Sequence, residues 1–244
     1  MPFPIIYVGG GKGGTGKSLT SMLVVHHLLH ALDLDVLLVE TDTSNPDVFR
    51  CYEKTPRVKA VSLNLDVDDG WVSLVNLCEA HPNKVVVVSS AARNQLGVKD
   101  NSDILTSMIE ALGRQLVVFW VINADRDGVE LLLDFQEVVG AVRYYVVRNL
   151  KFGPEDAFKD YNSSSAREAI EAGGGQTLNL PRLAADVARA LYSERLSIEK
   201  ALVKMPLGNR GALSSWCARC AEGVGGALAR EVAASQPAET AEPA

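Results

Sequence analysis

The chain has 244 residues, of which 47% are hydrophobic and 22% are charged, and its formal net charge is −6. This length allows one α/β domain of ordinary size or two small ones, and the composition is that of a globular protein rather than a disordered one. The negative charge excludes the overall basic surface of a dedicated nucleic-acid-binding protein, although it leaves room for a local basic patch.

The cysteine content and the distribution of apolar residues indicate the cellular compartment of the protein. The four cysteines, Cys51, Cys78, Cys217 and Cys220, are too few for a disulfide framework in a chain of this length, so reduced thiols are expected. Residues 1–9 lack the basic stretch and the long apolar stretch of a secretory signal, and no apolar run is long enough to span a bilayer. We therefore expect a cytoplasmic protein that does not insert into a membrane.

Short runs of valine, isoleucine and leucine alternate along the chain with segments of helical period, which is typical of βα units around a buried parallel sheet. Strands are predicted at residues 4–9, 35–39, 62–65, 84–89, 116–122 and 142–147. Helices are predicted between them, at residues 17–31, 71–81, 102–113 and 126–140. The predicted fold is α/β, with a doubly wound and mostly parallel sheet flanked by helices.

Beyond residue 150 the pattern predicts mainly helices. They fall near residues 155–172, 182–192, 196–203 and 208–233, with a short stretch at 177–181 between the first two. We expect one P-loop domain over residues 1–205, a C-terminal helix over 206–234 that packs on this domain or on a partner, and a disordered Pro/Ala/Glu tail over 235–244.

A phosphate-binding motif lies between the first predicted strand and the first predicted helix. It matches G-x-x-x-x-G-K-[ST] and reads Gly11-Lys12-Gly13-Gly14-Thr15-Gly16-Lys17-Ser18. Glycines let backbone N–H groups turn toward phosphate oxygens, and the following helix adds the positive end of its dipole. We expect Lys17 to reach the β and γ phosphates of a nucleotide and the Ser18 hydroxyl to bind Mg²⁺. The alternative is a glycine-rich turn without a ligand.

The second lysine of this motif, Lys12, resembles the early lysine of the deviant Walker A motif of the ParA/MinD family, to which nitrogenase iron protein and arsenite-pump ATPases also belong. In that family the early lysine contacts nucleotide phosphates across a dimer that sandwiches the nucleotides. The resemblance implies that Lys12 acts in trans, much as an arginine finger does. A solvated loop lysine is the alternative reading.

The resemblance continues into the second strand and the loop after it, which reads Glu40-Thr41-Asp42-Thr43-Ser44-Asn45-Pro46-Asp47. Asp42 occupies a position where family members orient the attacking water and approach the Mg²⁺ shell, and a carboxylate at the end of a parallel strand lies at the ligand crevice. Capping of the following turn is its alternative role. Glu40 replaces the first aspartate of the usual pair, and its detailed contact stays open.

Two later positions also resemble the family. Ser89 stands where the family has an aspartate that senses the γ-phosphate through Mg²⁺, and a serine adds no negative charge there. Asn149 ends a strand at the place where relatives carry an asparagine that reads the adenine edge, and its amide suits that donor and acceptor pattern. A plain loop residue is the alternative for Asn149.

These matches cover roughly residues 4–205 and imply ATP and Mg²⁺ as ligands. Lys12, Lys17 and Asp42 are the catalytic candidates. The sequence of residues 40–47 is similar to that of proteins encoded with plasmid mobilisation and conjugal-transfer genes, of the MobD-like or TraL-like type. The resemblance therefore implies an ATP-dependent dimerisation switch with weak ATPase activity in plasmid partition, mobilisation or conjugal DNA transfer, with a second copy, a relaxosome protein or DNA as partner.

Two alternative functions remain open. A nucleotide-gated adaptor with little hydrolysis is suggested by Ser89, and a small-molecule kinase or ligase on a similar fold would need a substrate site that the sequence does not reveal. Basic residues in the last third of the chain are candidates for a DNA-binding patch: Lys151, Lys159, Arg167, Arg182, Arg189, Arg195, Lys200, Lys204 and Arg210.

Three remaining patterns carry less weight. Among His26, His27 and His30, the i, i+3 and i, i+4 spacings place two imidazoles on one helix face, but no acidic or cysteine partner stands beside them in sequence, so core packing is favoured over metal binding. The lone Cys217–Cys220 pair lacks the second pair that would indicate zinc. The last predicted helix has an apolar stripe with a polar face of mixed charge, which favours docking on protein over lipid.

Overall fold

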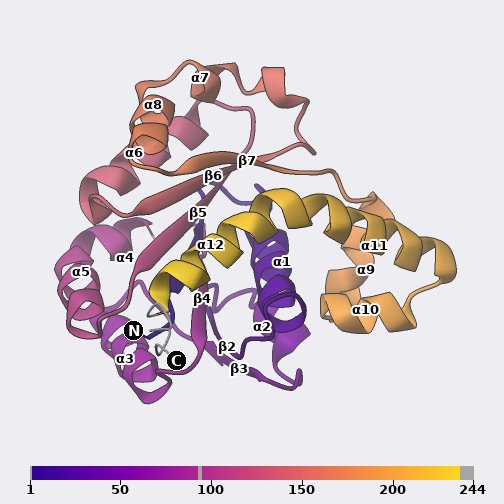
Figure 1. The fold of residues 1–244 in the computed structure, drawn as a ribbon, viewed down its shortest axis with the longest axis horizontal. Coiled ribbons are helices and arrows are strands. Elements are labelled where there is room, and N and C mark those ends of the chain that lie inside the picture. The colour runs from indigo at the N-terminus through magenta and orange to yellow at the C-terminus, as the bar shows by residue number, and fades with distance from the viewer. Residues whose placement is uncertain (1, 93–94, 237–244) are drawn as a thin grey trace, which may run out of the picture.

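The computed structural model describes residues 2–92 and 95–236 and contains one sheet in which all neighbouring strands are parallel (Figure 1). The strand order is β3-β2-β4-β1-β5-β6-β7. The strands are β1 (Ile5–Gly9), β2 (Val36–Glu40), β3 (Val58–Ser62), β4 (Val85–Ser89), β5 (Leu116–Ile122), β6 (Arg143–Asn149) and β7 (Gln176–Leu180). The α/β fold with a doubly wound parallel sheet, predicted from the sequence, is confirmed.

Helices cover both faces of the sheet and form a three-layer structure with two apolar cores. One face carries α1 (Lys17–His30), α2 (Asp47–Tyr52), α9 (Ala185–Ser193), α10 (Ile198–Lys204), α11 (Leu207–Cys220) and α12 (Gly226–Ser235). The other face carries α3 (Asp68–Ala80), α4 (Gln95–Asp100), α5 (Ser102–Ala111), α6 (Asp127–Val139), α7 (Lys159–Asn162) and α8 (Ser165–Ala172).

The strands are apolar on both sides because their side chains alternate between these two cores. In β2, for example, Val36 and Leu38 belong to the core under α1, whereas Leu37 and Val39 belong to the core under α3 and α6. All four are fully buried. This explains why the strands appear in the sequence as continuous apolar runs rather than alternating patterns.

The structure differs from the predicted elements at three places. The third strand lies at 58–62 rather than 62–65, because it is an edge strand whose residues are half-buried or exposed and give a weak apolar signal. Leu65, at the end of the predicted range, is buried in the other core from outside the strand. The helices α2 and α4 were not predicted, since six residues are too few to show a helical period.

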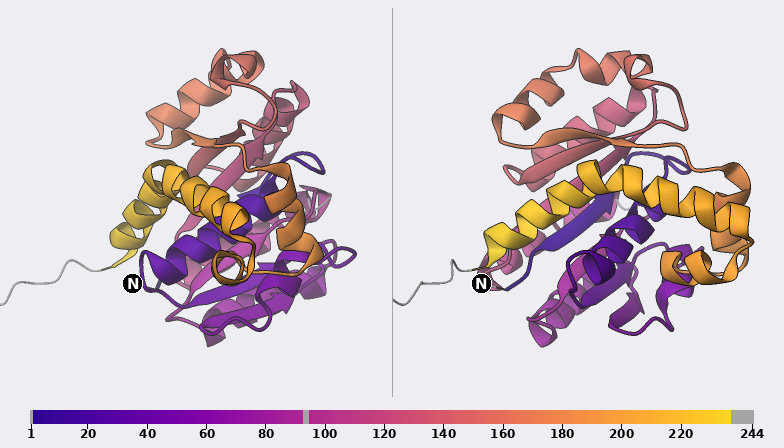
Figure 2. Two further views of the ribbon diagram at one scale, coloured as in Figure 1. Left: turned by 90° about the vertical axis from the view of Figure 1, so that its right-hand side faces the viewer. Right: turned by 45° about the vertical axis from the view of Figure 1, so that its right-hand side comes forward.

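The C-terminal region crosses the face of the sheet that carries α1. Helix α11, a π-helical turn (Ala221–Gly225) and α12 follow one another as a long rod (Figures 1 and 2). The residues of the predicted apolar stripe are all buried in the core on this face: Leu213, Trp216, Cys220, Val224, Leu228 and Val232. The rod therefore packs on the sheet of its own chain. Residues 237–244 of the predicted tail lie outside the described residues.

Two hydrogen bonds attach this rod to the sheet and its loops. The Trp216 indole N–H donates to the carbonyl of Pro181 at 2.7 Å, and the Tyr145 hydroxyl donates to Oε1 of the buried Glu231 at 2.5 Å. Arg143 also pairs with this carboxylate, with Nε and Oε1 3.6 Å apart. These polar contacts within an apolar interface fix the position of the rod along the sheet.

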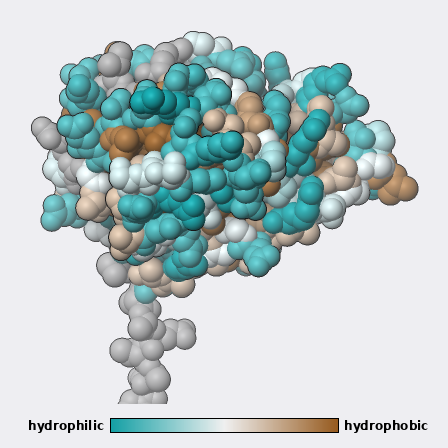
Figure 3. Space-filling model, turned by 90° about the horizontal axis from the view of Figure 1, so that it is seen from above, coloured by the Kyte–Doolittle hydropathy of each residue, from teal (hydrophilic) through white to brown (hydrophobic). Residues whose placement is uncertain are grey.

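The face seen from above in Figure 3 is mostly covered by hydrophilic side chains, with small hydrophobic areas between them. Among the described residues, the most exposed large hydrophobic side chains are those of Val203 and Leu207, at 74% and 77% exposure, on either side of the turn between α10 and α11. No helix in the described ranges is both long and apolar enough to cross a membrane.

If the C-terminal rod is part of the folded core, replacing Trp216 by alanine should lower the free energy of unfolding by about 3 to 5 kcal/mol. The indole is fully buried, so its removal leaves a cavity and also an unpaired Pro181 carbonyl. The matched control is Leu207→Ala in the same helix, for which a change within about 0.5 kcal/mol is expected because this leucine is exposed. Urea denaturation measures both, and equal effects would contradict the prediction.

Candidate functional site

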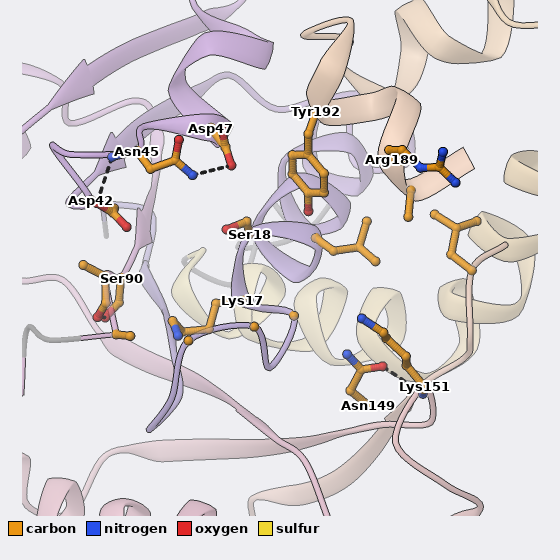
Figure 4. A pocket seen from close by; sticks show the side chains of 18 of the residues that line it. Lys17, Ser18, Asp42, Asn45, Asp47, Ser90, Asn149, Lys151, Arg189 and Tyr192 are labelled. Atoms are coloured by element: carbon orange, nitrogen blue, oxygen red, sulfur yellow. Dashed lines mark hydrogen bonds between the residues drawn. The ribbon is translucent and has the colours of Figure 1, made fainter. Parts of the chain in front are cut away.

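A cavity of about 670 Å³ opens at the edge of the sheet where the strands end (Figure 4). Its walls come from the loops that follow β1, β2, β4, β6 and β7 and from the helices α1 and α9. The carboxyl ends of parallel strands all reach the same edge, which is why ligand crevices of open α/β sheets lie there. The volume is within the range of small-ligand sites.

The P-loop forms one wall of this cavity. Of the nine residues predicted to bind a nucleotide, six line it: Gly13, Gly14, Gly16, Lys17, Ser18 and Asn149. The other three, Gly11, Lys12 and Thr15, are not among the described residues that line it. Thr15 is instead buried behind the loop, where its hydroxyl donates to the Lys12 carbonyl at 3.2 Å.

Gly16 shows why this loop needs glycine. Its φ is +109°, in the region that residues with a Cβ rarely adopt. A Cβ at this position would also lie 2.4 Å from Nδ2 of Asn149. That amide donates to the Thr15 carbonyl at 2.7 Å, and Oδ1 of Asn149 accepts from the Lys151 N–H at 3.0 Å. Asn149 therefore holds the P-loop against the end of β6, and its contact with adenine stays a prediction.

The Lys17 ammonium lies inside the cavity, on a residue that is only 7% exposed. It donates to the Lys12 carbonyl at 2.6 Å. Burial lowers the pKa of Lys17 to about 8, while the carboxylates of Asp42 and Glu40 act in the opposite direction. A phosphate group beside Lys17 would stabilise the ammonium further.

Lys12 lies outside the cavity of its own chain. Its ammonium pairs with the carboxylate of Asp127, the first residue of α6, at 2.5 Å. The hydrogen bond to Asp127 raises the pKa of Lys12, and both side chains are about half exposed. An ion pair this open to water contributes little stability, so Lys12 is easily released from it. Asp127 could not be identified from the sequence, because it is distant from Lys12 along the chain and the pair forms only when β1 and β5 lie side by side.

Asp42 and Ser18 both line the cavity, from the loop after β2 and from the first turn of α1 (Figure 4). Oδ1 of Asp42 accepts from the backbone N–H groups of Ser44 and Asn45 at 3.2 and 3.0 Å. Asp42 thus caps the turn, which is the alternative role considered for it in the sequence analysis. Its carboxylate also lines the cavity.

Glu40, whose contact the sequence left open, is almost completely buried and holds the same loop. One carboxylate oxygen accepts from the Asp42 N–H at 3.0 Å, and the other accepts from the Val48 N–H in the first turn of α2 at 3.3 Å. Burial raises the pKa of Glu40 to about 7, an effect that the two backbone donors reduce. The longer glutamate side chain is what spans from β2 to α2.

The loop after β4 carries no carboxylate among the described residues that line the cavity, which here are Ser90, Ala91 and Ala92. Ser89, the residue singled out from the sequence, is buried at the end of β4 and is not one of them. The Ser90 hydroxyl accepts from the Tyr7 hydroxyl at 2.8 Å, and the Ala91 N–H donates to the Thr41 hydroxyl at 2.8 Å. The second bond joins the loops after β2 and β4.

The lining residues that the sequence analysis did not assign to the site include Lys151, Arg182, Arg189 and Tyr192. Lys151 and Arg182 closely follow the ends of β6 and β7, which is the positional signal that could have identified them. Arg189 and Tyr192 come from α9 (Figure 4). Arg189 also pairs with Asp186 of the same helix. Three candidates for a DNA patch therefore line this cavity.

The two cysteines of the C-terminal pair are free thiols: Cys220 is buried in the core and Cys217 is half-buried. Among the residues that the structure describes, neither belongs to a group of three or more potential metal ligands. Burial raises the pKa of Cys217 to about 11 and that of Cys220 to about 12, which keeps both protonated at neutral pH.

No family model matches the sequence. Protein MobD of Acidithiobacillus ferrooxidans is 44% identical over 216 residues, which cover 88% of this chain and 94% of that protein. The cell division ATPase MinD of Pyrococcus furiosus has a similar structure, with a TM-score of 0.56 and 13% identity over 90% of this chain and 98% of that one. The ATP complex of a Cyanothece McdA variant gives a TM-score of 0.53 and 13% identity over 92% and 97% of the two chains.

The structural likeness, at these low identities, concerns the fold alone, whereas the identity to MobD extends over nearly the whole of both chains. The chain therefore belongs to the MobD family and has the fold of the ParA/MinD P-loop NTPases.

Proposed function

We propose that this protein binds ATP with Mg²⁺ in the cavity at the end of the sheet and that the bound nucleotide joins two copies of the chain. The observation that carries the proposal is the P-loop itself, whose glycines and the start of α1 line a cavity that holds the buried Lys17 ammonium. A glycine loop, a helix N-terminus and a cation at one place form a phosphate site.

The residues beside this site suit a magnesium ion. Ser18, Glu40, Asp42 and Asp47 all line the cavity and offer hydroxyl or carboxylate oxygens, the ligands that Mg²⁺ prefers. We assign Ser18 and Asp42 to the ion. When bound there, Mg²⁺ would neutralise charge on the phosphates, and the Asp42 carboxylate would orient the water that attacks the γ-phosphate.

Other residues that line the cavity suit a base. Asn149 lies at the end of β6, Arg189 and Tyr192 offer cationic and aromatic surface from α9 (Figure 4), and Leu183 adds an apolar side chain. An aromatic ring and a guanidinium both stack on flat ligands. We propose that the adenine lies between Asn149 and α9.

Lys12 is the basis for the dimer. It does not reach its own cavity, and its ion pair with Asp127 is solvent-exposed and weak. A phosphate group of a second protomer's nucleotide is a stronger partner for this ammonium than an exposed carboxylate. We propose that Lys12 leaves Asp127 and contacts the nucleotide of the other protomer.

The process that this switch serves is proposed from the kinship with MobD. We place it in plasmid mobilisation, with partition and conjugal transfer as related roles, and expect a relaxosome-type protein or plasmid DNA as the partner. The resemblance of residues 40–47 to proteins of this type supports the same assignment.

A nucleotide-gated adaptor with little hydrolysis is the second candidate function. It is favoured by the loop after β4, where Ser90, Ala91 and Ala92 line the cavity without a carboxylate. In this case bound ATP would hold the dimer together, and the release of ATP would let the two copies separate. Phosphate release by the wild-type protein separates the adaptor from the ATPase.

Lys17→Ala is expected to weaken Mg²⁺–ATP binding by about 10- to 100-fold, since it removes a buried charge-assisted contact with phosphate. Lys204→Ala, an exposed lysine in α10, is the matched control and should bind as the wild type does. Isothermal titration calorimetry measures the affinities. A wild-type protein that fails to bind ATP at millimolar concentration would refute the proposed function.

Lys12→Ala is expected to bind ATP with an affinity within about threefold of the wild type yet to stay monomeric with a slowly hydrolysed ATP analogue. The reason is that Lys12 does not line its own cavity. Sedimentation velocity in the presence of the analogue measures the dimer. A variant that dimerises as well as the wild type would show that Lys12 does not act in trans.

Glu40 provides a prediction on pH. Because its pKa rises from 4.5 to about 7 on folding, its contribution to stability is full below pH 4.5 and is lost as the pH rises through 7. The free energy of unfolding of the wild type, relative to Glu40→Gln, should therefore fall by about 1 to 3 kcal/mol between pH 4.5 and 8 without nucleotide. Urea denaturation at several pH values tests this, and a difference independent of pH would contradict it.

A further inference from the structure

Two histidines of α1 and one glutamate of α10 form a cluster outside the nucleotide cavity. His26 and His30 are one helical turn apart, with ring centroids separated by 4.8 Å, and Glu199 approaches them from the neighbouring helix. Nε2 of His30 is 3.8 Å from Oε2 of Glu199, and one ligand atom from each of the three residues lies within 4.8 Å of the others.

The polar atoms of this cluster lack the hydrogen bonds that buried groups normally have. Nδ1 of His26 and both carboxylate oxygens of Glu199 are shielded from solvent and have no hydrogen-bond partner among the described residues. A carboxylate whose two oxygens are both buried without a donor is costly, and most native structures satisfy such groups or place an ion beside them.

The unpartnered Nδ1 of His26 is a nitrogen through which this cluster can bind a ligand. A neutral imidazole nitrogen has a lone pair that is available to a Lewis acid.

We propose that His26, His30 and Glu199 bind a divalent transition-metal ion, with Zn²⁺ as the best match. Two imidazole nitrogens at i and i+4 and a carboxylate from a second helix are a donor set that Zn²⁺ takes, whereas Mg²⁺ and Ca²⁺ prefer oxygen ligands alone. This site is separate from the oxygen-lined cavity beside Ser18 and Asp42.

The geometry allows the site to close on an ion by side-chain rotation. Ligand atoms around tetrahedral Zn²⁺ are about 3.4 Å apart, given metal–ligand distances near 2.0 to 2.1 Å. The present separations of up to 4.8 Å must therefore shorten by up to about 1.4 Å. The side chain of His30 is 48% exposed and has room to turn, and a fourth position remains for water.

The ion would connect two parts of the chain that are distant in sequence. Helix α1 begins at the P-loop with Lys17, and α10 opens the C-terminal helical region that crosses the sheet. A shared ion would brace α10 against α1, and it would stabilise only the folded state because the ligands converge only there.

The test uses the untagged full-length protein, stripped of metal with a chelator and titrated with Co²⁺ and with Zn²⁺. Cobalt in a site with nitrogen and oxygen ligands gives a visible absorption band whose strength reports the coordination number, and native mass spectrometry gives the stoichiometry. The variants are His30→Ala and Glu199→Gln, the second of which keeps the shape of the side chain. His81→Ala, which removes the histidine that follows α3, is the matched control.

We expect one ion per chain, a rise in Tm of about 5 to 10 °C at a metal concentration about a hundredfold above Kd, and no need for nucleotide. His30→Ala and Glu199→Gln should each weaken the affinity by at least about tenfold while keeping the wild-type circular dichroism, and His81→Ala should bind normally. Absence of stoichiometric binding, or affinities of His30→Ala and Glu199→Gln equal to that of the wild type, would overturn the proposal.

Discussion

The parallel direction of the strands is the constraint on which the site depends. Because neighbouring strands never reverse, the loops after β1, β2, β4, β6 and β7 all emerge at one edge of the sheet and enclose the cavity there. Their positions are then fixed by bonds between loops: Asn149 holds the P-loop from β6, and Thr41 joins the loops after β2 and β4. The cavity is thus a property of the sheet, and its chemistry is set by a few residues at the strand ends.

Charge within the cavity is balanced by opposing effects of burial. The same exclusion of water that lowers the pKa of Lys17 to about 8 raises that of Glu40 to about 7. The carboxylates of Asp42 and Glu40 favour the charged form of Lys17 and so oppose the effect of its burial. A ligand with both anionic phosphates and a divalent cation would stabilise Lys17 and Glu40 in their charged forms, which neither an anion nor a cation alone would achieve.

The residues of the site that could be predicted from the sequence lie within a short motif or directly after a recognisable strand. A single short motif contains Gly13, Gly14, Gly16, Lys17 and Ser18, and Asp42 closely follows a recognisable strand, so local pattern sufficed for both. Asp127, Arg189 and Glu199 contact their partners or the cavity only through the packing of distant elements, and no local pattern marks them. The fold class followed from continuous apolar runs that are separated along the chain by segments of helical period. The exposed edge strand β3 and the short helices α2 and α4 lacked such a signal.

The C-terminal rod connects the cavity to the rest of this face of the molecule. The loop after β7 lines the cavity through Pro181, whose carbonyl accepts from the buried Trp216 in α11, so a hydrogen bond holds this loop to the rod. Farther along, the π-helical turn brings Gly225 so close to His27 that a Cβ there would lie 2.4 Å from the ring. The rod is therefore packed tightly against α1, the helix that begins with Lys17. The helix that begins at the P-loop and the loop that carries Pro181 therefore both adjoin the buried face of the rod.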